Sequence, residues 1–242
     1  MPVPTTPTNT SYRAIGQKGK TKRDTLKRII AEFRSRGLEV PPEMLEQMKG
    51  ILPTYMFKKS PNGYYMGMDS RIFNANPKQD LFIQSNARFV FMCAGRGAGK
   101  PGSGAQKALK KLEQGWCGVV GNPDFENLKI STWPEFARWC DYQMVVPKQR
   151  HRLQPDWQPN QPFKLNFNNG AWAIFKGIKD PDSARGPNVN WFWYDEPGRG
   201  DPLGQDWQIA NASVRVGKDP QAWATGTPRS STRYTSTCTA TP

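Results

Sequence analysis

The sequence has one histidine, His151, and only four cysteines in 242 residues. The cysteines are widely spaced and form no C-x-x-C pair, so we expect no zinc site, and a chain of this length rarely depends on a disulfide framework. They are Cys93, Cys117, Cys140 and Cys238. This usage indicates a protein of a reducing, intracellular compartment.

Long apolar runs are also missing. No stretch of eighteen or more apolar residues occurs, so we expect no membrane-spanning helix. The first residues, MPVPTTPTNTSYRAIG, lack the apolar segment of a secretory signal.

Acidic residues are few. Twenty Asp and Glu stand against thirty-four Lys and Arg, which gives a net charge of +14. Residues 1–60 hold twelve basic and five acidic side chains, and so carry half of that charge. Such a balance favours polyanionic partners, whether DNA, RNA or an acidic protein. The alternative is a solvated basic tail that aids solubility.

The N-terminal quarter is predicted to be a basic, partly disordered helical arm over residues 1–60. Residues 1–12 are rich in Pro and Thr. Residues 24–36 have the apolar spacing of an amphipathic helix that ends at Gly37. A second short helix is predicted over 42–49, with proline at its start. The arm either binds a partner or packs on the domain that follows.

From about residue 70 the pattern changes to apolar strands that alternate with helices. Strands are predicted in ARFVFMCA (87–94), WCGVVGN (116–122), KLNFNN (164–169), AWAIFKG (171–177), NVNWFWYDE (188–196) and QAWATGTPR (221–229). Helices are predicted in AQKALKKLEQ (105–114) and ISTWPEFARWC (130–140). An Asn-Asn-Gly turn makes 164–177 a hairpin. The alternation indicates an α/β domain, placed at 61–230, with functional loops at the carboxyl ends of a mainly parallel sheet.

A glycine-rich segment, AGRGAGKPGSG at 94–104, stands between a predicted strand and a predicted helix. It approximates the phosphate-binding pattern G-x-x-x-x-G-K-[ST], in which backbone N–H groups and a lysine hold phosphate oxygens. Gly99 and Lys100 match, whereas Ala94 and Pro101 depart from the pattern. The alternative is a flexible glycine-rich linker.

Two further segments fit a nucleotide site. WFWYDEP ends an apolar strand with Asp195, suited to holding magnesium, and Glu196, suited to taking a proton from water. ATGTPR at 224–229 ends another strand with small hydroxyl residues that can sense a phosphate. Alone, either segment is an ordinary strand end.

Together, AGRGAGK, SARGPNVNWFWYDEP and ATGTPR resemble the ATPase domain of the phage terminase large subunit, which packages DNA into procapsids. NPKQDLF and FNNGAWAIFKGIKDPDSARGPN extend the resemblance over roughly residues 70–230. It implies a P-loop NTPase-like three-layer α/β fold with a mainly parallel central sheet, preceded by a short helical N-terminal element.

The resemblance also implies roles for single residues. Gln79 is expected to read adenine, and Arg96 to approach the γ-phosphate. Glu196 is expected to be the catalytic base and Asp195 the magnesium ligand. The cradle for ATP is expected to comprise Gly95, Arg96, Gly97, Ala98, Gly99 and Lys100. The coupling segment is expected to comprise Thr225, Gly226 and Thr227, and Arg185 with Gly186 a structural turn.

Two departures from the family stand out. Pro101 removes the hydroxyl expected to bind magnesium and one backbone N–H, and it disfavours α conformation at Lys100. The fold should survive because proline is tolerated in a first turn, but we expect poor hydrolysis. Ser103 offers a hydroxyl two residues too far along. In addition, residues 231–242 are a Ser/Thr-rich tail without a carboxylate, so no nuclease site is expected.

The leading hypothesis is therefore a DNA-packaging ATPase that uses ATP and Mg2+. By resemblance its partners are double-stranded DNA, a portal protein, a small terminase subunit and copies of itself in a ring, in the host cytoplasm at the procapsid. One competitor is a helicase-like ATPase. The other is a basic DNA-binding or assembly protein that retains the fold without hydrolysis, which Pro101 favours.

Overall fold

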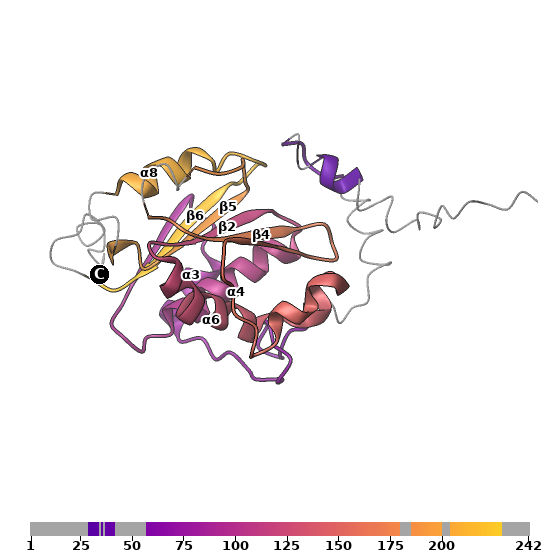
Figure 1. Cartoon of the computed structure of the whole chain (residues 1–242). Helices are drawn as coiled ribbons and strands as arrows, with labels where there is room; N and C mark the ends of the chain where they lie inside the picture. Colours follow the sequence, from indigo (N-terminus) through magenta and orange to yellow (C-terminus); the bar gives the residue numbers. More distant parts are fainter. Residues whose placement is uncertain are drawn as a thin grey trace, which may run out of the picture.

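The computed structural model describes residues 29–33, 35, 37–41, 57–179, 185–199 and 204–228. Its centre is a six-stranded sheet in the order β1-β6-β5-β2-β4-β3 (Figure 1). The strands are β1 (Phe89–Cys93), β2 (Gly118–Asn122), β3 (Phe163–Asn166), β4 (Trp172–Gly177), β5 (Trp191–Asp195) and β6 (Gln221–Gly226). All neighbouring strands are parallel except β3, which pairs antiparallel with β4 at the edge.

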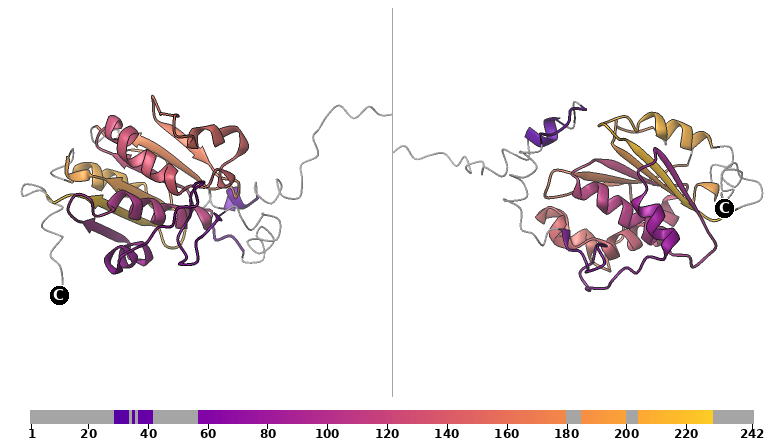
Figure 2. Two further views of the ribbon diagram at one scale, coloured as in Figure 1. Left: turned by 90° about the horizontal axis from the view of Figure 1, so that it is seen from below. Right: turned by 180° about the vertical axis from the view of Figure 1, so that it is seen from behind.

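Helices cover both faces of this sheet, which makes the domain three-layered (Figures 1 and 2). The longer ones are α3 (Pro77–Gln84), α4 (Lys100–Glu113), α6 (Trp133–Trp139) and α8 (Gln205–Ala212). The other helical segments are α5 (Phe125–Asn127), the π-helix η2 (Leu128–Thr132) and the 3-10 helices η3 (Tyr142–Met144), η4 (Pro147–Leu153) and η5 (Pro197–Arg199). Helices α3, α4 and α6 lie on one face, and α8 lies on the other.

The two faces have separate hydrophobic cores because successive side chains of a strand point in opposite directions. On β5, Trp191 and Trp193 belong to the core beneath α4 and α6. Phe192 and Tyr194 belong to the core beneath α8. Asp195 continues the first series, so its carboxylate is directed to the α4 face.

Helix α4 packs unusually close to β5. A Cβ atom added to Gly104 would lie 2.4 Å from the buried indole of Trp193. Only glycine allows this approach, which brings the first turn of α4 over the ends of the central strands.

The predicted fold class is confirmed, as are the predicted strands and the hairpin formed by β3 and β4. Helices α3 and α8 were not predicted as such. Of the helix predicted over 24–36, the described residues 29–33 and 35 are helical. The helix predicted over 42–49 and the tail 231–242 lie outside the described residues, and the domain boundaries stay predictions.

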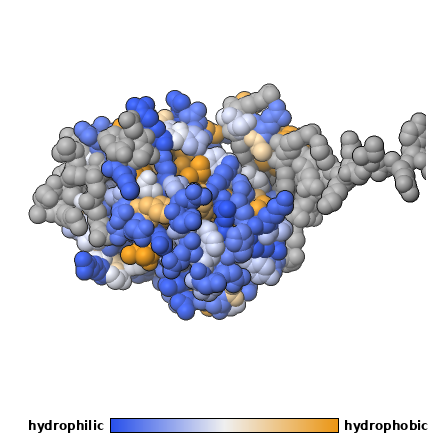
Figure 3. All heavy atoms as spheres, viewed as in Figure 1, coloured by the Kyte–Doolittle hydropathy of each residue, from blue (hydrophilic) through white to orange (hydrophobic). Residues whose placement is uncertain are grey.

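The surface is mainly hydrophilic on the face shown in Figure 3, where apolar residues form small separate groups. In the described part of the chain, no helix is long and apolar enough to cross a membrane.

Candidate nucleotide site

The glycine-rich loop connects β1 to α4 at the carboxyl edge of the sheet. Gly97 and Gly99 have φ angles of 77° and 66°, in the left-handed region that favours glycine. Gly99 is the N-cap of α4, and no side chain caps this helix end. The free N–H groups and the helix dipole therefore face the loop, which suits an anion such as a phosphate.

Lys100 is buried at the first position of α4. Its Nζ donates a hydrogen bond to the Gly95 carbonyl oxygen at 3.0 Å and lies 3.7 Å from Glu196 Oε1. The ammonium group thus closes the loop onto itself. A phosphate that enters the loop competes with the Gly95 carbonyl for this ammonium group.

Pro101 lies in the first turn of α4, where the helix tolerates proline. The fold survives it, as predicted. Lys100 is nevertheless the first residue of the helix, although the following proline disfavours α conformation there. The hydroxyl of Ser103 donates to the Gly99 carbonyl oxygen at 3.0 Å. Ser103 is thus engaged within its own helix and is a poor substitute for the hydroxyl that Pro101 removes.

Gln79 lies beneath the loop, and both ends of its carboxamide are engaged. Its Nε2 donates to the Ala98 carbonyl oxygen at 3.0 Å, and its Oε1 accepts from the Asn76 N–H at 2.8 Å. The second bond is half of a capping box at the start of α3. Gln79 therefore ties α3 to the loop, and its predicted contact with adenine stays a prediction.

Asp195 ends β5 and is fully buried. Its Oδ1 accepts a hydrogen bond from the Thr225 hydroxyl and its Oδ2 one from the Thr132 hydroxyl, both at 2.7 Å. Burial raises the pKa of the carboxyl to about 6, against the two hydroxyls, which lower it. Glu196 raises this pKa further, and Lys100 lowers it.

Glu196 follows with a φ of 54°, which is uncommon for a residue other than glycine. Its N–H donates to the Thr225 carbonyl oxygen at 2.6 Å. Its carboxylate accepts two hydrogen bonds from Thr227, one from the backbone N–H at 3.1 Å and one from the hydroxyl at 3.0 Å. The partly exposed carboxylate is therefore held between the loop lysine and the end of β6.

The strand order explains why these groups meet. Strand β6 lies between β1 and β5, so the segment after β6 stands between the loop and the acidic pair. Asp195 is paired in register with Thr225. The structure thus brings together the side chains of Lys100, Asp195, Glu196, Thr225 and Thr227.

Other predicted residues lie at the margin of this group. Arg96 is exposed on the loop and has no ion-pair partner in the described part of the chain. Arg185 and Gly186 are exposed, and the Arg185 carbonyl oxygen accepts a hydrogen bond from Lys176 Nζ at 2.6 Å.

Sequence reasoning missed two residues of the site, Thr132 and Asn122. Asn122 Nδ2 donates to the Thr132 hydroxyl oxygen at 3.1 Å, and both side chains are buried. Thr132 lies in a segment that was predicted only as part of a helix. The one local signal was Asn122, a polar residue that ends an apolar strand.

The residues present fit a magnesium ion that arrives with a nucleotide. No group of three or more His, Cys, Asp and Glu residues that could hold a metal occurs among the described residues. Magnesium is typically bound through one or two carboxylates together with substrate phosphates. Asp195 supplies one such carboxylate beside the loop.

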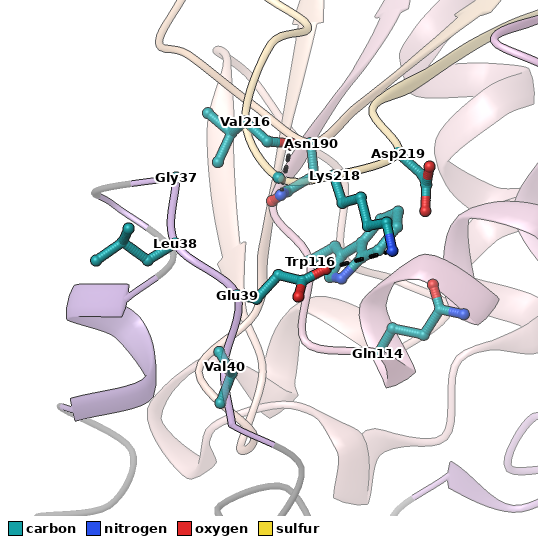
Figure 4. A pocket seen from close by; sticks show the side chains of 11 residues that line it. Gly37, Leu38, Glu39, Val40, Gln114, Trp116, Asn190, Val216, Lys218 and Asp219 are labelled. Atoms are coloured by element: carbon teal, nitrogen blue, oxygen red, sulfur yellow. Dashed lines mark hydrogen bonds and ion pairs between the residues drawn. The ribbon is translucent and has the colours of Figure 1, made fainter.

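A hollow of about 310 Å³ lies elsewhere (Figure 4). Trp116, Asn190 and Asp219, which line it, precede β2, β5 and β6. It therefore opens at the amino edge of the parallel strands, opposite the glycine-rich loop. Figure 4 also shows Glu39 from the N-terminal segment pairing with Lys218 across it, at 4.0 Å.

The fold and the loop thus define a P-loop-type α/β domain. No protein-family model and no curated protein matches the chain. Among solved structures it is similar to the large terminase ATPase domain of Thermus phage P74-26, at 21% identity and a TM-score of 0.48, and to a mutant of that domain, at 20% and 0.46. The large terminase of bacteriophage HK97 is also similar, at 14% and 0.46.

These similarities cover 65% of this chain in the first two cases and 67% in the third. They span 66% of each Thermus phage chain and 35% of the HK97 chain. All three of these solved structures are phage large terminases or the ATPase domain of one. Because all three TM-scores are below 0.5, the function is inferred from the site residues of this chain.

Proposed function

We propose that this chain is the ATPase part of a phage large terminase, which couples ATP hydrolysis to the movement of double-stranded DNA. One observation carries the proposal. Lys100 at the end of a glycine-rich loop lies 3.7 Å from Glu196, which follows the buried Asp195 at the end of β5. A cation for phosphates, a ligand for magnesium and a base for water thus meet at one edge of the sheet.

The roles follow from the chemistry of these groups. Magnesium bound with ATP would supply positive charge to the phosphates, and Asp195 is the residue that would hold it. Lys100 leaves the Gly95 carbonyl to bind phosphate oxygens, and Arg96 adds charge from the exposed side of the loop. Gln79 contacts adenine by giving up one of its two internal bonds.

Hydrolysis requires a base for the attacking water. Glu196 takes a proton from that water as its oxygen bonds to the γ-phosphorus, and ADP leaves with the bridging oxygen. Thr227 donates two hydrogen bonds to the same carboxylate, so its segment responds when Glu196 moves. Thr225, Gly226 and Thr227 are therefore proposed to transmit hydrolysis to the surface that grips DNA.

The proposed partners are double-stranded DNA, a portal protein, a small terminase subunit and further copies of this chain in a ring. The proposed place of action is the procapsid portal in the host cytoplasm. The chain's net charge of +14 supports a polyanionic partner.

A second candidate function is a DNA-binding or assembly protein that binds nucleotide without turnover. The position of Pro101 and the inward bond of Ser103 favour it, because neither residue offers a hydroxyl to magnesium. Loss of one metal ligand costs on the order of 100-fold in rate.

ATP turnover with Mg2+ and double-stranded DNA tests both candidates, together with binding of a fluorescent ATP analogue. The chain is compared with Pro101→Thr, and Lys100→Ala is the control that should lose binding. We expect weak turnover that rises at least tenfold in Pro101→Thr. Binding without turnover in either protein would favour the second candidate, and loss of binding in both would contradict both.

A further inference from the structure

Two threonine hydroxyls donate hydrogen bonds to the Asp195 carboxylate, one to each oxygen. Thr225 belongs to β6 and is in register with Asp195. Thr132 comes from η2, 63 positions away in sequence and outside every nucleotide motif. All three side chains are fully buried. Thr132 can therefore influence the reaction only through its hydrogen bond to Asp195.

The direction of the Thr132 bond is fixed by its neighbours. Asn122 Oδ1 accepts the Asp124 N–H at 3.2 Å, which turns the Asn122 amide nitrogen towards Thr132. An amide NH2 only donates, so the Thr132 oxygen is the acceptor and its own proton goes to Asp195. Trp193 Nε1 directs the Thr225 hydroxyl in the same way at 2.8 Å.

The backbone at Thr132 is also unusual. Residues Leu128–Thr132 form a π-helix, and the N–H of Trp133 donates to the Leu128 carbonyl oxygen. Such wide turns are rare and often occur at functional sites. Here the turn ends at the residue whose hydroxyl reaches the carboxylate.

No hydroxyl within α4 donates a hydrogen bond to the Asp195 carboxylate. Position 101 is proline, and the Ser103 hydroxyl donates to Gly99. The orientation of Asp195 depends on the hydroxyls of Thr132 and Thr225, and each leaves lone pairs on the carboxylate for a cation.

We propose that Thr132, held by Asn122, is a positioning residue that orients Asp195 for the magnesium of the bound nucleotide. The inference rests on the proposed function. Hydrogen-bonding partners of metal ligands typically change metal affinity by about 10–100-fold when they are removed.

The experiment compares the full chain with Thr132→Val, which keeps the shape and loses the hydroxyl, and Thr132→Ser, which keeps the hydroxyl. A fluorescent ADP analogue is titrated with EDTA and at increasing Mg2+, and thermal unfolding is recorded. Mg2+ should raise the affinity for the ADP analogue. We expect the Mg2+ concentration that gives half of this increase to be at least about tenfold higher in Thr132→Val than in the wild type. Affinity in EDTA should stay the same, and Thr132→Ser should remain within about twofold of the wild type.

A lower unfolding temperature in Thr132→Val with an unchanged Mg2+ requirement would show a structural role only and overturn the inference. If Thr132→Val does not fold, Thr132→Ala is compared with Thr132→Ser, because these two differ only in the hydroxyl; an equal Mg2+ requirement would again overturn it. A wild-type chain that binds no nucleotide, with or without Mg2+, contradicts the proposed function itself.

Discussion

The backbone of Glu196 carries strain that its neighbours hold in place. A φ of 54° costs a residue with a side chain roughly 1–3 kcal/mol. The bonds from Glu196 to the end of β6 offset this cost, since its N–H reaches Thr225 and its carboxylate accepts twice from Thr227. Strain of this kind collects at functional sites, which supports Glu196 as the reactive member of the acidic pair.

The first prediction concerns this residue. Glu196→Gln keeps the size of the side chain and can still accept from Thr227, but it cannot take a proton. We expect ATP turnover to fall by about 10²–10⁴-fold, while binding of a fluorescent ATP analogue stays within about threefold. Turnover assays in the Pro101→Thr background give the larger signal. Equal turnover in Pro101→Thr with and without Glu196→Gln would show that Glu196 is not the base.

Asp195 gives a prediction on pH. Its pKa is raised by burial from 3.8 to about 6, so between these values the folded chain holds a proton that the unfolded chain has lost. The contribution of Asp195 to stability therefore falls as pH rises from about 4 to 6, by up to roughly 3 kcal/mol.

Urea unfolding of the wild type and Asp195→Asn between pH 4.5 and 8 measures this effect. The free energy of unfolding of Asp195→Asn, relative to that of the wild type, should increase up to about pH 6 and then stay level. A difference that is constant across the range would mean that the carboxyl is ionised throughout.

At the scale of elements, the contact between α4 and β5 sets the geometry of the site. Trp193 fills the space beneath Gly104, and its Nε1 donates to the Thr225 hydroxyl. A movement of the indole would therefore disturb the Thr225 hydroxyl, which donates a hydrogen bond to Asp195.

Gly104→Ala is the corresponding prediction. Alanine gains about 1 kcal/mol of helix propensity, but the new Cβ would lie 2.4 Å from a buried ring. Overpacking costs typically 1–3 kcal/mol, and we expect it to win, so the thermal midpoint should fall by several degrees. Gly95→Ala is the control, because a Cβ there meets no atom within 4 Å. An unchanged midpoint in Gly104→Ala would mean that α4 moves freely over β5.

The elements also show what the sequence could predict. The strands were found because each is an apolar run bounded by turn residues. Helix α3 escaped, although Asn76, Pro77 and Gln79 form a local capping signal. Thr132 could not be found at all, since its bond to Asp195 joins residues 63 positions apart. Motif positions were predictable because each is local; the network behind them depends on how the strands are ordered.

At the scale of the whole molecule, charge is the property that reaches furthest. The net charge of +14 favours contact with phosphate groups and gives no means of distinguishing bases. A packaging ATPase must pass any sequence, so backbone contact alone is what this function requires.

The last prediction follows from that requirement. Binding of double-stranded DNA should weaken steeply with salt, with the logarithm of the association constant falling by about 0.9 per phosphate neutralised for each tenfold rise in salt. Five contacts thus give a slope of about −4.5. Fluorescence anisotropy with two unrelated duplexes, from 50 to 300 mM NaCl, measures both slope and sequence preference. The two duplexes should give matching curves, because phosphate contacts carry no sequence information. A slope near zero, or a strong preference for one duplex, would mean that the chain reads bases instead of neutralising phosphates, and such a protein could not translocate DNA of arbitrary sequence.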